Sequence, residues 1–476
     1  MQLSPARAPA ALVAALLATA AVADDAIEEI VVTADFRERP ASELPTSVTV
    51  LSGDEIRGAA QQHFEELVNI VPNLNWSGDG HRARYFQIRG IGELEQYEAA
   101  PNPSVGFLID DIDFSGIGTV ATLFDMESVE VLRGPQGSRY GASALAGLIY
   151  MRSRAPSAER DGRLRLSVGD DDSLSLGMAF GGALDASERV TFRVSGQRHA
   201  SNGFRDNTWL DRDDTNGREE TSLRARLRIE ASDELEVNVA TMYTDIDNGY
   251  DAFALDNSYT VLSDKPGTDA QESLGASLRV DWSGPANGTL TAITAFAGSD
   301  IGFGFDADWG NDDSWAPVTY DYTSLTDRER RTLSQEFRFV AEGWLVGVYA
   351  LDLSEDLRTT NIGDYYDPFY DWADTLNDVF GSDFASTNLA VFGQMDKDLG
   401  PATRLSAGLR VEHRSVDYAD TLGLETSPSE TMWGGELGLS HDFNDGLMGY
   451  ASLSRGYKAG GFNLGAVPTG FRTFND

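Results

Sequence analysis

The chain has 476 residues, enough for more than one domain, and it contains no cysteine, which excludes a disulfide framework and thiolate chemistry. Acidic side chains outnumber basic ones by 76 to 37, and the resulting net charge of −39 argues against a nucleic-acid partner. Beyond the N-terminus, no apolar run approaches the roughly 20 residues that a membrane-spanning helix needs. A membrane barrel would instead show its signal as alternating strands.

The first 23 residues have the layout of a secretory signal peptide. Arg7 supplies the positive charge, Ala10 to Ala18 form the apolar centre, and Ala21 to Ala23 match the small-residue cleavage pattern. The alternative, a buried alanine-rich helix, does not account for this order of features at an extreme terminus. The sequence therefore predicts an exported protein whose mature chain begins at Asp24.

A short β-prone segment follows the cleavage site at Glu28–Ala34. Its central residues, Ile30 to Thr33, favour extended structure and lie between charged and small residues. The segment has no partner strand beside it in the sequence, so it can add as an edge strand to another protein. We assign residues 24–42 to this segment and to the tether that joins it to the next domain.

Residues 43–158 carry the mixed pattern of a compact α+β domain. The expected elements are a strand at Leu44–Val50, helices at Asp54–Ala60 and Gln61–Val71, and strands at Tyr85–Gly90 and Val105–Ile112. Two polar loops, Ser77–Arg84 and Glu93–Pro103, separate these elements.

Two further strands meet near the end of this domain, within Met126–Arg152. The first, Val129–Leu132, is broken by Arg133-Gly134-Pro135, because glycine takes positive φ and proline has no N–H to offer a ladder. The second is the apolar run Gly147–Met151. A crossing rich in glycine and alanine joins the two strands, and it requires very close backbone packing. The stretch therefore predicts a compact core element, not a flexible linker.

This stretch resembles the plug domain of TonB-dependent outer-membrane receptors. The family pattern is a strand that ends in Arg-Gly, then Arg-Gly-Pro, an aromatic–glycine pair, and Ala-x-Gly-Gly-x-Ile-Asn. The matching residues are Arg89, Gly90, Arg133, Gly134, Pro135, Tyr140, Gly141, Ala144 and Ile149. Ala146 and Tyr150 depart from the pattern, where the family has glycine and asparagine. We expect those departures to change the local turn geometry.

The resemblance extends to the β-prone segment, which is similar to the TonB box of these receptors. In the family, this box pairs with the periplasmic energy-transducing protein TonB. The residues expected to bind TonB are Glu29, Ile30, Val31, Val32 and Thr33. The box lies only a few residues past the cleavage site. That spacing leaves no room for the extra small domain of members that signal to sigma-factor regulators.

The same resemblance implies that polar loops of the plug can rise to face a ligand chamber. The candidate ligand-facing residues in these loops are Arg82, Arg84, Glu95 and Tyr97. The alternative, an ordinary connecting loop, applies equally to each of them.

From Gly162 the pattern changes to strict alternation. Leu223, Leu227 and other apolar residues alternate with Arg224, Arg226 and other charged ones, which is the pattern of half-buried antiparallel strands. A soluble sandwich would also alternate. Consecutive arginines on one face, however, suit a watery lumen, and the connections alternate between short and long. The short turns lie near Asp185, Ser232, Pro285, Glu342, Pro401 and Asp445; the long loops are 200–220, 247–270, 301–327, 358–384 and 417–430, with a short outer exception at Gly169–Asp172.

The expected fold is an all-β transmembrane barrel with the α+β plug inside. Residues 159–476 contain thirteen candidate strands. Bacterial barrels have an even number of strands, and family barrels that hold a plug have about 22. The sequence thus predicts a partial barrel, a curved open sheet with unpaired edges at Gly162–Gly169 and Gly446–Lys458. The stretch Tyr450–Asn463 resembles a motif that lies well before the family's C-terminus. We therefore expect an N-terminal fragment of a longer receptor, truncated before its last strands.

Two clusters in the outer loops suggest possible sites. Aromatic residues in one loop can capture a ligand by stacking, although they can equally form an interfacial girdle or pack within the loop. The candidate ligand-facing residues there are Tyr365, Tyr366, Tyr370 and Trp372. Oxygen ligands for calcium occur in another loop, at Asp306, Asp308, Asn311, Asp312 and Asp313. Their spacing is not that of an EF-hand, so we expect solvated acids and predict no metal and no cofactor.

The five histidines do not indicate an active site. They are His63, His81, His199, His413 and His441, and the chain has neither an H-E-x-x-H nor a G-x-S-x-G motif. We predict no catalytic residue and no enzyme activity. A Ser–His–Asp arrangement across strands stays open as an alternative.

The family resemblance implies energy-coupled uptake of a scarce substrate across the bacterial outer membrane, with a ferric siderophore as the first expectation. Ser334–Phe339 and Phe392–Gln394 resemble the iron-complex branch. Related branches carry cobalamin, oligosaccharides or aromatic compounds. A passive pore or a surface adhesin, the alternative class, would need no TonB box. The expected partners are TonB with its inner-membrane energising complex, outer-membrane lipid, and an iron chelate or another small molecule.

Overall fold

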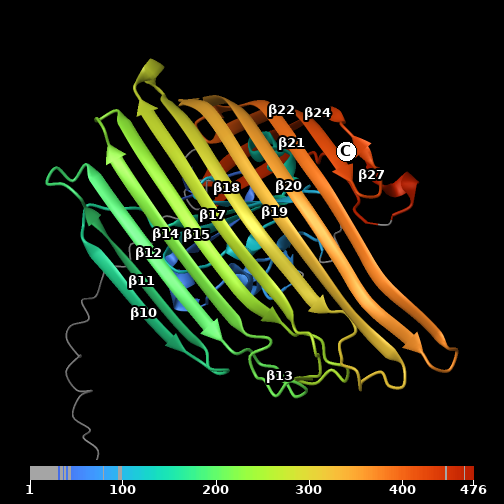
Figure 1. The fold of residues 1–476 in the computed structure, drawn as a ribbon. Helices are drawn as coiled ribbons and strands as arrows, with labels where there is room; N and C mark the ends of the chain where they lie inside the picture. The colour runs from blue at the N-terminus through green and yellow to red at the C-terminus, as the bar shows by residue number, and fades with distance from the viewer. Residues whose placement is uncertain are drawn as a thin grey trace, which may run out of the picture.

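The computed structural model describes residues 31–32, 36, 39–40, 44–59, 61–78, 80–94, 99–444, 447–465 and 467–475. The expected signal peptide, residues 1–23, lies outside the described residues. Two units are evident: a small mixed domain, and a large tilted sheet that runs across it (Figure 1). Within the described residues, no helix combines the length and the apolar character needed to cross a membrane.

The small domain is built on a five-stranded sheet in the order β3-β8-β9-β6-β7. The strands of this sheet are β3 Ser47–Ser52, β6 Val105–Ile109, β7 Ile112–Asp113, β8 Met126–Arg133 and β9 Gly147–Ser153. Strands β6 and β9 are parallel, and the other neighbours are antiparallel. A separate pair is formed by β4 Leu74–Ser77 and β5 Tyr85–Ile88.

Helical segments connect these strands. They are α1 Gly53–Ala59, η2 Phe64–Ile70, η3 Gly118–Val120, α2 Gly137–Tyr140 and η4 Gly141–Ala144. The helix expected at Gln61–Val71 is therefore a shorter 3-10 helix. Its N-terminus is capped by the His63 ring, which accepts a hydrogen bond from the Glu65 amide. The single strand expected at Val105–Ile112 instead turns back at Asp110 and Asp111, both with positive φ, to give β6 and β7.

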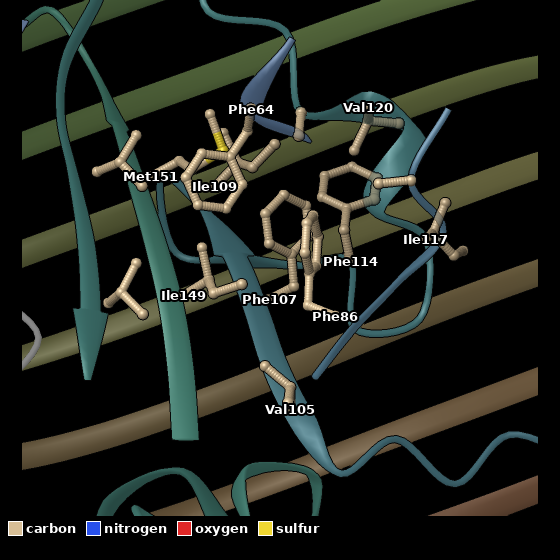
Figure 2. Packing of buried hydrophobic residues seen from close by; sticks show 14 of the residues in the cluster. Phe64, Phe86, Val105, Phe107, Ile109, Phe114, Ile117, Val120, Ile149 and Met151 are labelled. Atoms are coloured by element: carbon tan, nitrogen blue, oxygen red, sulfur yellow. The ribbon is translucent and has the colours of Figure 1, made fainter. Parts of the chain in front are cut away.

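The core of the small domain is an aromatic and aliphatic cluster between the sheet and the helical segments (Figure 2). The Phe107 ring lies 5.6 Å from the Phe86 ring, which in turn lies 5.5 Å from the Phe64 ring. Met242 and Ile301 of the large sheet belong to the same buried cluster. The core of the small domain is thus completed by the wall of the large sheet.

The large sheet is a sequential antiparallel meander of thirteen strands, as the sequence predicted. The strands are β10 Asp161–Val168, β11 Leu174–Ala183, β12 Val190–Ser201, β14 Arg218–Glu230, β15 Leu235–Tyr250, β17 Gly267–Ser283, β18 Thr289–Asp306, β19 Thr319–Ala341, β20 Trp344–Asp367, β21 Trp372–Gly400, β22 Thr403–Asp420, β24 Ser429–Asn444 and β25 Leu447–Arg455. A short strand, β23 Glu425–Thr426, pairs with β22 off this path. In the part of the chain that the structure describes, β10 and β25 do not pair with each other. The curved open sheet expected from the sequence is therefore confirmed.

The two faces of this sheet have opposite character. Arg224 points toward the small domain and is 6% exposed, whereas its neighbour Leu223 points away and is 50% exposed. The outward face carries exposed leucines, valines and phenylalanines on nearly every strand. An apolar outer face with charges inside is the arrangement of a membrane barrel, and it reverses that of a soluble protein.

The connections also follow the predicted alternation. The short turns gather at the upper edge of the sheet in Figure 1, and the loops with β13 Asp206–Asn207 gather at the lower edge. The loop expected at 358–384 is an exception, because β20 continues to Asp367 and β21 starts at Trp372. Polar residues there were interpreted as loop. They form a paired ladder instead, since a strand outside lipid needs no apolar face.

One row of outward-facing carboxylates crosses the sheet. Its members lie directly opposite one another on six consecutive strands, from β15 to β21. They are Asp245, Glu272, Asp300, Glu329, Asp356 and Asp383. Like charges directly opposite each other destabilise a strand pair, and Arg331 offsets this repulsion at Glu329 by an ion pair. We refer to these six residues as the acidic row.

Candidate functional site

The segment expected to bind TonB is partly described. Val31 and Val32 form β1, whereas Glu29, Ile30 and Thr33 lie outside the described residues. The segment was predicted to have no partner in its own chain, and this is wrong. Strand β1 pairs antiparallel with β2, Arg39–Pro40, and Val32 is buried against Leu132 and Tyr150 of the plug. A two-residue ladder contains few hydrogen bonds, so it is a weak pairing.

Phe36 fastens the tether between β1 and β2. Its ring centroid lies 5.0 Å from that of Tyr140 and 5.8 Å from that of Phe392 on β21. The Arg338 guanidinium lies 4.5 Å from the same ring centroid, on β19. Phe36 thus connects the N-terminal segment both to the plug and to the barrel wall.

The plug motif residues have structural roles. The Arg133 side chain donates to Ser47 Oγ and Thr49 Oγ1, at 3.0 and 2.6 Å, and so joins β8 to β3. Gly141 has φ of +78°, and a Cβ there would lie 2.5 Å from Glu412 Oε2 on β22. Glycine is therefore needed at Gly141 for close approach of the plug to the barrel. Arg89, Gly90 and Gly134 also have positive φ, and Pro135 follows the last of these.

The Ser77–Arg84 loop is fixed between the plug and the barrel. Arg82 and Arg84 are 2% and 4% exposed, so neither side chain is presented to a ligand. The Arg82 Nη1 lies 2.9 Å from Glu65 Oε1, and its Nε and Nη2 donate to the two carboxylate oxygens of Glu220 on β14, at 2.7 and 2.6 Å. The bidentate geometry makes this a strong charge-assisted contact. Glu95 and Tyr97, the other loop candidates, lie outside the described residues.

His81 makes a neighbouring contact with the barrel. Its backbone N–H donates to Asp269 Oδ2 at 2.7 Å, and its Nε2 lies 2.6 Å from the Gly249 carbonyl oxygen. Burial and the nearby Arg218 charge lower the pKa of His81 to about 4. The ring is therefore neutral at physiological pH and donates from Nε2 to the carbonyl.

Lowering the pH is expected to destabilise the Ser77–Arg84 loop by protonating Glu65, which holds Arg82 and the Ala83 amide. Burial alone would raise the pKa of Glu65, but His63, Arg82 and the Ala83 amide together hold it at about 2. Because that value lies below the ordinary 4.5, the ionised carboxylate adds stability above pH 4.5, and this stability is lost as the pH falls toward 2. Thermal unfolding followed between pH 7 and pH 3 measures the effect. Glu65→Gln should flatten the profile, and an unchanged profile would contradict the assignment.

Further contacts tie the plug to two parts of the wall. On β12 and β14, Arg193 donates to Asp125 at 2.7 Å, and Arg224 donates to the Thr122 carbonyl at 2.9 Å. A second group lies on β22, on β24 and on the chain after β25. The Arg139–Glu436 and Lys458–Glu93 ion pairs measure 2.9 and 2.8 Å, and Arg410 donates to the Arg139 carbonyl at 2.9 Å.

A polar cavity of about 840 Å³ lies between the plug and the wall of β14 to β20. The plug side includes Asp110, Asp111 and Tyr150, and the wall side includes Arg279, Glu336 and Arg338. It is on the side of the short turns, since Ser232 and Ser283 next to those turns also line it. A cavity of this size and polarity can hold water or a small polar molecule.

The aromatic candidates are only partly brought together. The Tyr365 ring lies 5.1 Å from the Trp372 ring and 6.3 Å from the Tyr320 ring, on the lumen side of β19 to β21. Tyr366 and Tyr370 are exposed and outside this group. Tyr320 and Tyr322, with rings 4.8 Å apart, were missed in the sequence analysis. They lie two residues apart at the start of β19, and that spacing was the signal that they share a strand face.

The acidic loop at 306–313 is more buried than the sequence predicted. Asp306, Asp308 and Asn311 were expected as solvated acids and amide, but all three are buried. Asp306 accepts hydrogen bonds from the Asp308 and Trp309 amides at 3.2 and 3.3 Å, and Asp308 accepts one from the Tyr322 amide at 2.9 Å. These side chains thus fold the loop. Over the described residues, no three acidic or histidine side chains are grouped as a metal site.

Two family descriptions match the chain. Residues 40–148 match the TonB-dependent receptor plug domain. Residues 155–475, well over half of the chain, match the TonB-dependent receptor-like β-barrel.

Several curated proteins resemble parts of the chain. The pesticin receptor of Yersinia pestis is 32% identical over 146 residues, or 30% of this chain and 21% of that protein. The ferrioxamine B receptor of Salmonella typhimurium is 28% identical over 170 residues, or 35% and 24%. The vitamin B12 transporter BtuB of Vibrio vulnificus is 24% identical over 206 residues, or 43% and 33%. The chain thus spans between about a fifth and a third of these relatives.

Solved structures share the fold. The ferric yersiniabactin uptake receptor FyuA from Yersinia pestis has a TM-score of 0.72 and 20% identity, over 90% of this chain and 67% of that one. The pyoverdine receptor FpvA from Pseudomonas aeruginosa has a TM-score of 0.66 and 16% identity, over 89% and 64%. The plug motif and the strand alternation had pointed to the same assignment. The chain belongs to the TonB-dependent receptors, a family of bacterial outer-membrane receptors and transporters.

Proposed function

We propose that this protein imports a scarce small molecule, an iron chelate, across the outer membrane with energy supplied by TonB. The observation that carries the proposal is the weakly held strand β1 at the start of the plug. A two-residue ladder costs little to exchange for a longer one, so β1 is suited to pair with a strand of TonB. The inner-membrane energising complex would then pull through TonB. No catalytic step is part of this proposal.

The tether gives a route for that pull. Tension on β1 would first act on Phe36, which lies against Tyr140 of the plug and Phe392 of the wall. Tyr140 ends α2, next to the Gly141 that approaches Glu412. A force on Phe36 would therefore reach the place where the plug lies closest to β22.

The substrate class is supported by likeness and by one feature of the wall. The receptors for pesticin, ferrioxamine B and ferric yersiniabactin are among the similar proteins. The cluster of Tyr320, Tyr365 and Trp372 on the lumen side presents flat rings that can stack on a planar ligand. A corrinoid is the second candidate, because BtuB proteins are also similar to this chain. Oligosaccharides, other aromatic compounds, and the passive pore or adhesin remain the alternatives to be tested.

Replacing Val31 with proline tests the coupling. Proline lacks the strand N–H and clashes within a ladder, so TonB pairing should weaken by about tenfold or more. In cells that produce the receptor, uptake of ferric yersiniabactin and of a panel of iron chelates should be lost, while surface binding survives. Val31→Ile, which keeps the N–H, is the control and should retain uptake.

Four outcomes would contradict the proposal in whole or in part. Loss of surface binding together with uptake would mean that the segment supports the fold and not the coupling. Uptake that is unchanged by Val31→Pro would favour the passive pore. Growth that depends on cobalamin uptake would move the substrate assignment to the corrinoid. Failure to grow on every member of the iron panel would do the same.

A further inference from the structure

Strand β21 continues past the end of its neighbour β22 and has one free edge there. The pairing of β21 with β20 begins at Trp372, whereas its pairing with β22 begins only at Ser382. Just after β22 ends, the Thr421 N–H donates to the Gly381 carbonyl at 2.9 Å. Among the described strands, none pairs with residues 372–380 on this side. This stretch of β21 therefore presents a row of backbone groups to water, on the side of the long loops.

The backbone groups on this edge belong to alternate residues of β21. Gly381 turns toward the open side, because its N–H donates to Thr421 Oγ1 at 3.0 Å and its carbonyl accepts from the Thr421 N–H. Every second residue of an antiparallel strand points to the same neighbour. Thr375 therefore shares this orientation, and its N–H donates to Asp374 Oδ1 at 3.0 Å and not to a strand. The other N–H groups on the open side are those of Ala373, Asn377 and Val379.

The free edge carries charge of one sign. From residue 359 to residue 396 the chain has no lysine, arginine or histidine, while aspartates recur along the β20–β21 hairpin. Two of these, Asp374 and Asp378, lie four positions apart on the free stretch and so face the same side of the strand. The stretch also lacks proline and lysine, the residues that commonly block an exposed edge. An extended segment with basic residues four positions apart can pair with both aspartates.

The same charges argue against a second copy of this chain as the partner. If two copies paired antiparallel along all of 372–380, Asp374 of one copy would lie directly opposite Asp378 of the other. Like charges that face each other across a strand pair are destabilising. The net charge of −39 adds repulsion between whole molecules. The edge is therefore complementary to a basic partner and not to itself.

We propose that the free edge of β21 is a docking site for a soluble protein, which adds an extended basic segment to the sheet as a further strand. Main-chain hydrogen bonds supply the affinity, and Asp374 and Asp378 select the charge of the segment. Trp372 and Leu376 lie on the same face as these aspartates and are 54% and 38% exposed, so they offer apolar contact to the added strand. The docking is independent of the transport function proposed above, because it requires neither β1 nor the plug.

A designed strand peptide tests the docking on the purified receptor in a neutral detergent. The probe is a fluorescent peptide with blocked ends, Thr-Val-Lys-Val-Thr-Val-Lys-Val-Thr, whose two lysines have the spacing of Asp374 and Asp378. Fluorescence anisotropy measures its binding. Replacing both lysines with glutamate should weaken binding by about tenfold or more. Absence of binding by the lysine peptide, or equal binding of the two peptides, would overturn the proposal.

Methylation of the peptide nitrogens separates strand addition from simple charge attraction. In an antiparallel added strand, the valine N–H groups point toward β21, and the threonine and lysine N–H groups point away. Methylating the two central valine nitrogens should therefore abolish binding, whereas methylating the central threonine nitrogen should change it by less than about twofold. Both peptides keep the same charge. An unequal effect of the two methylations supports strand addition, and equal effects would overturn it.

Variants of the receptor locate the site. Asn377→Pro removes an edge N–H that β20 does not use, so it should abolish peptide binding, while Asn377→Val keeps the N–H and should retain it. Asp374→Asn combined with Asp378→Asn should weaken binding by about tenfold. Asp364→Asn is the matched control, since Asp364 accepts from the Thr375 hydroxyl on the opposite face of the hairpin. Equal losses in the control and the double variant, or a receptor dimer that Asn377→Pro dissociates, would contradict the basic partner.

Discussion

Replacing Arg82 with methionine should destabilise the docking of the plug in the barrel by about 3–5 kcal/mol. Arg82 is almost fully buried and makes bonds to Glu65 of the plug and to Glu220 of β14. Without its charge, two buried carboxylates lose their partner in a region of low dielectric constant. The loss is large because the desolvation of both acids remains, whereas the attraction that offset it is gone. The loss of stability is measured by thermal unfolding in detergent and by the protease sensitivity of the plug.

An exposed ion pair on the neighbouring strands β12 and β14 provides the control. Arg198 and Glu219 form an ion pair at 2.9 Å, with side chains 65% and 62% exposed. Because solvent screens exposed pairs, Arg198→Met should cost about 0–1 kcal/mol. Adding Glu220→Leu to Arg82→Met should restore part of the lost stability, since one of the unpaired acids is removed. Equal effects of Arg82→Met and Arg198→Met would show that the buried network does not hold the plug.

Replacing Phe107 with alanine should destabilise the plug by about 3–5 kcal/mol. Phe107 lies on β6 in the centre of the core, and its ring meets the Phe86 ring among aliphatic side chains (Figure 2). Truncation removes the buried ring and leaves a cavity, because the parallel pairing of β6 with β9 limits how far the sheet can collapse. Amide hydrogen exchange in β6 and β9 reports the change directly.

The exposed Ile70 on the same domain is the matched control. Ile70→Ala removes an apolar side chain that is 58% exposed, so it should change stability by less than about 0.5 kcal/mol. If Phe107→Ala left the exchange rates of β6 and β9 as low as in Ile70→Ala, the aromatic cluster would not be the core of the plug.

The sequence was sufficient to predict the barrel, because its signal is local. Side chains such as Leu223 and Arg224 point to opposite faces of a strand, so alternation reports the two environments directly. The number of strands followed from counting these stretches. The extension of β20 and β21 beyond the lipid was missed because both faces of a strand in water can be polar, as around Asn361. Polarity alone then does not distinguish a strand from a loop.

The candidate site was predicted less completely, since its contacts join residues far apart in the chain. Nothing near Arg82 in the sequence indicates that its partner is Glu220, 138 residues later. The pairing of β1 with Arg39–Pro40 was missed for a different reason. A two-residue strand that contains proline has no recognisable β signature. The Arg-Gly-Pro motif was recognised, but its role in joining β8 to β3 required the distances from Arg133.

The acidic row fixes the depth at which the protein sits in the bilayer. A line of carboxylates spaced about 4.8 Å apart cannot enter the hydrocarbon, so the apolar slab must end on the periplasmic side of the row. On β18, the stretch 289–299 lies between the short turn and Asp300, and its length matches the roughly 9–11 residues that a tilted strand needs to cross. On β20, residues 357–367 stand beyond Asp356, a rise of about 35 Å along the strand. Tyr365 and Trp372 therefore lie far above the headgroups, where a molecule arriving from the medium meets the protein before it reaches the membrane surface.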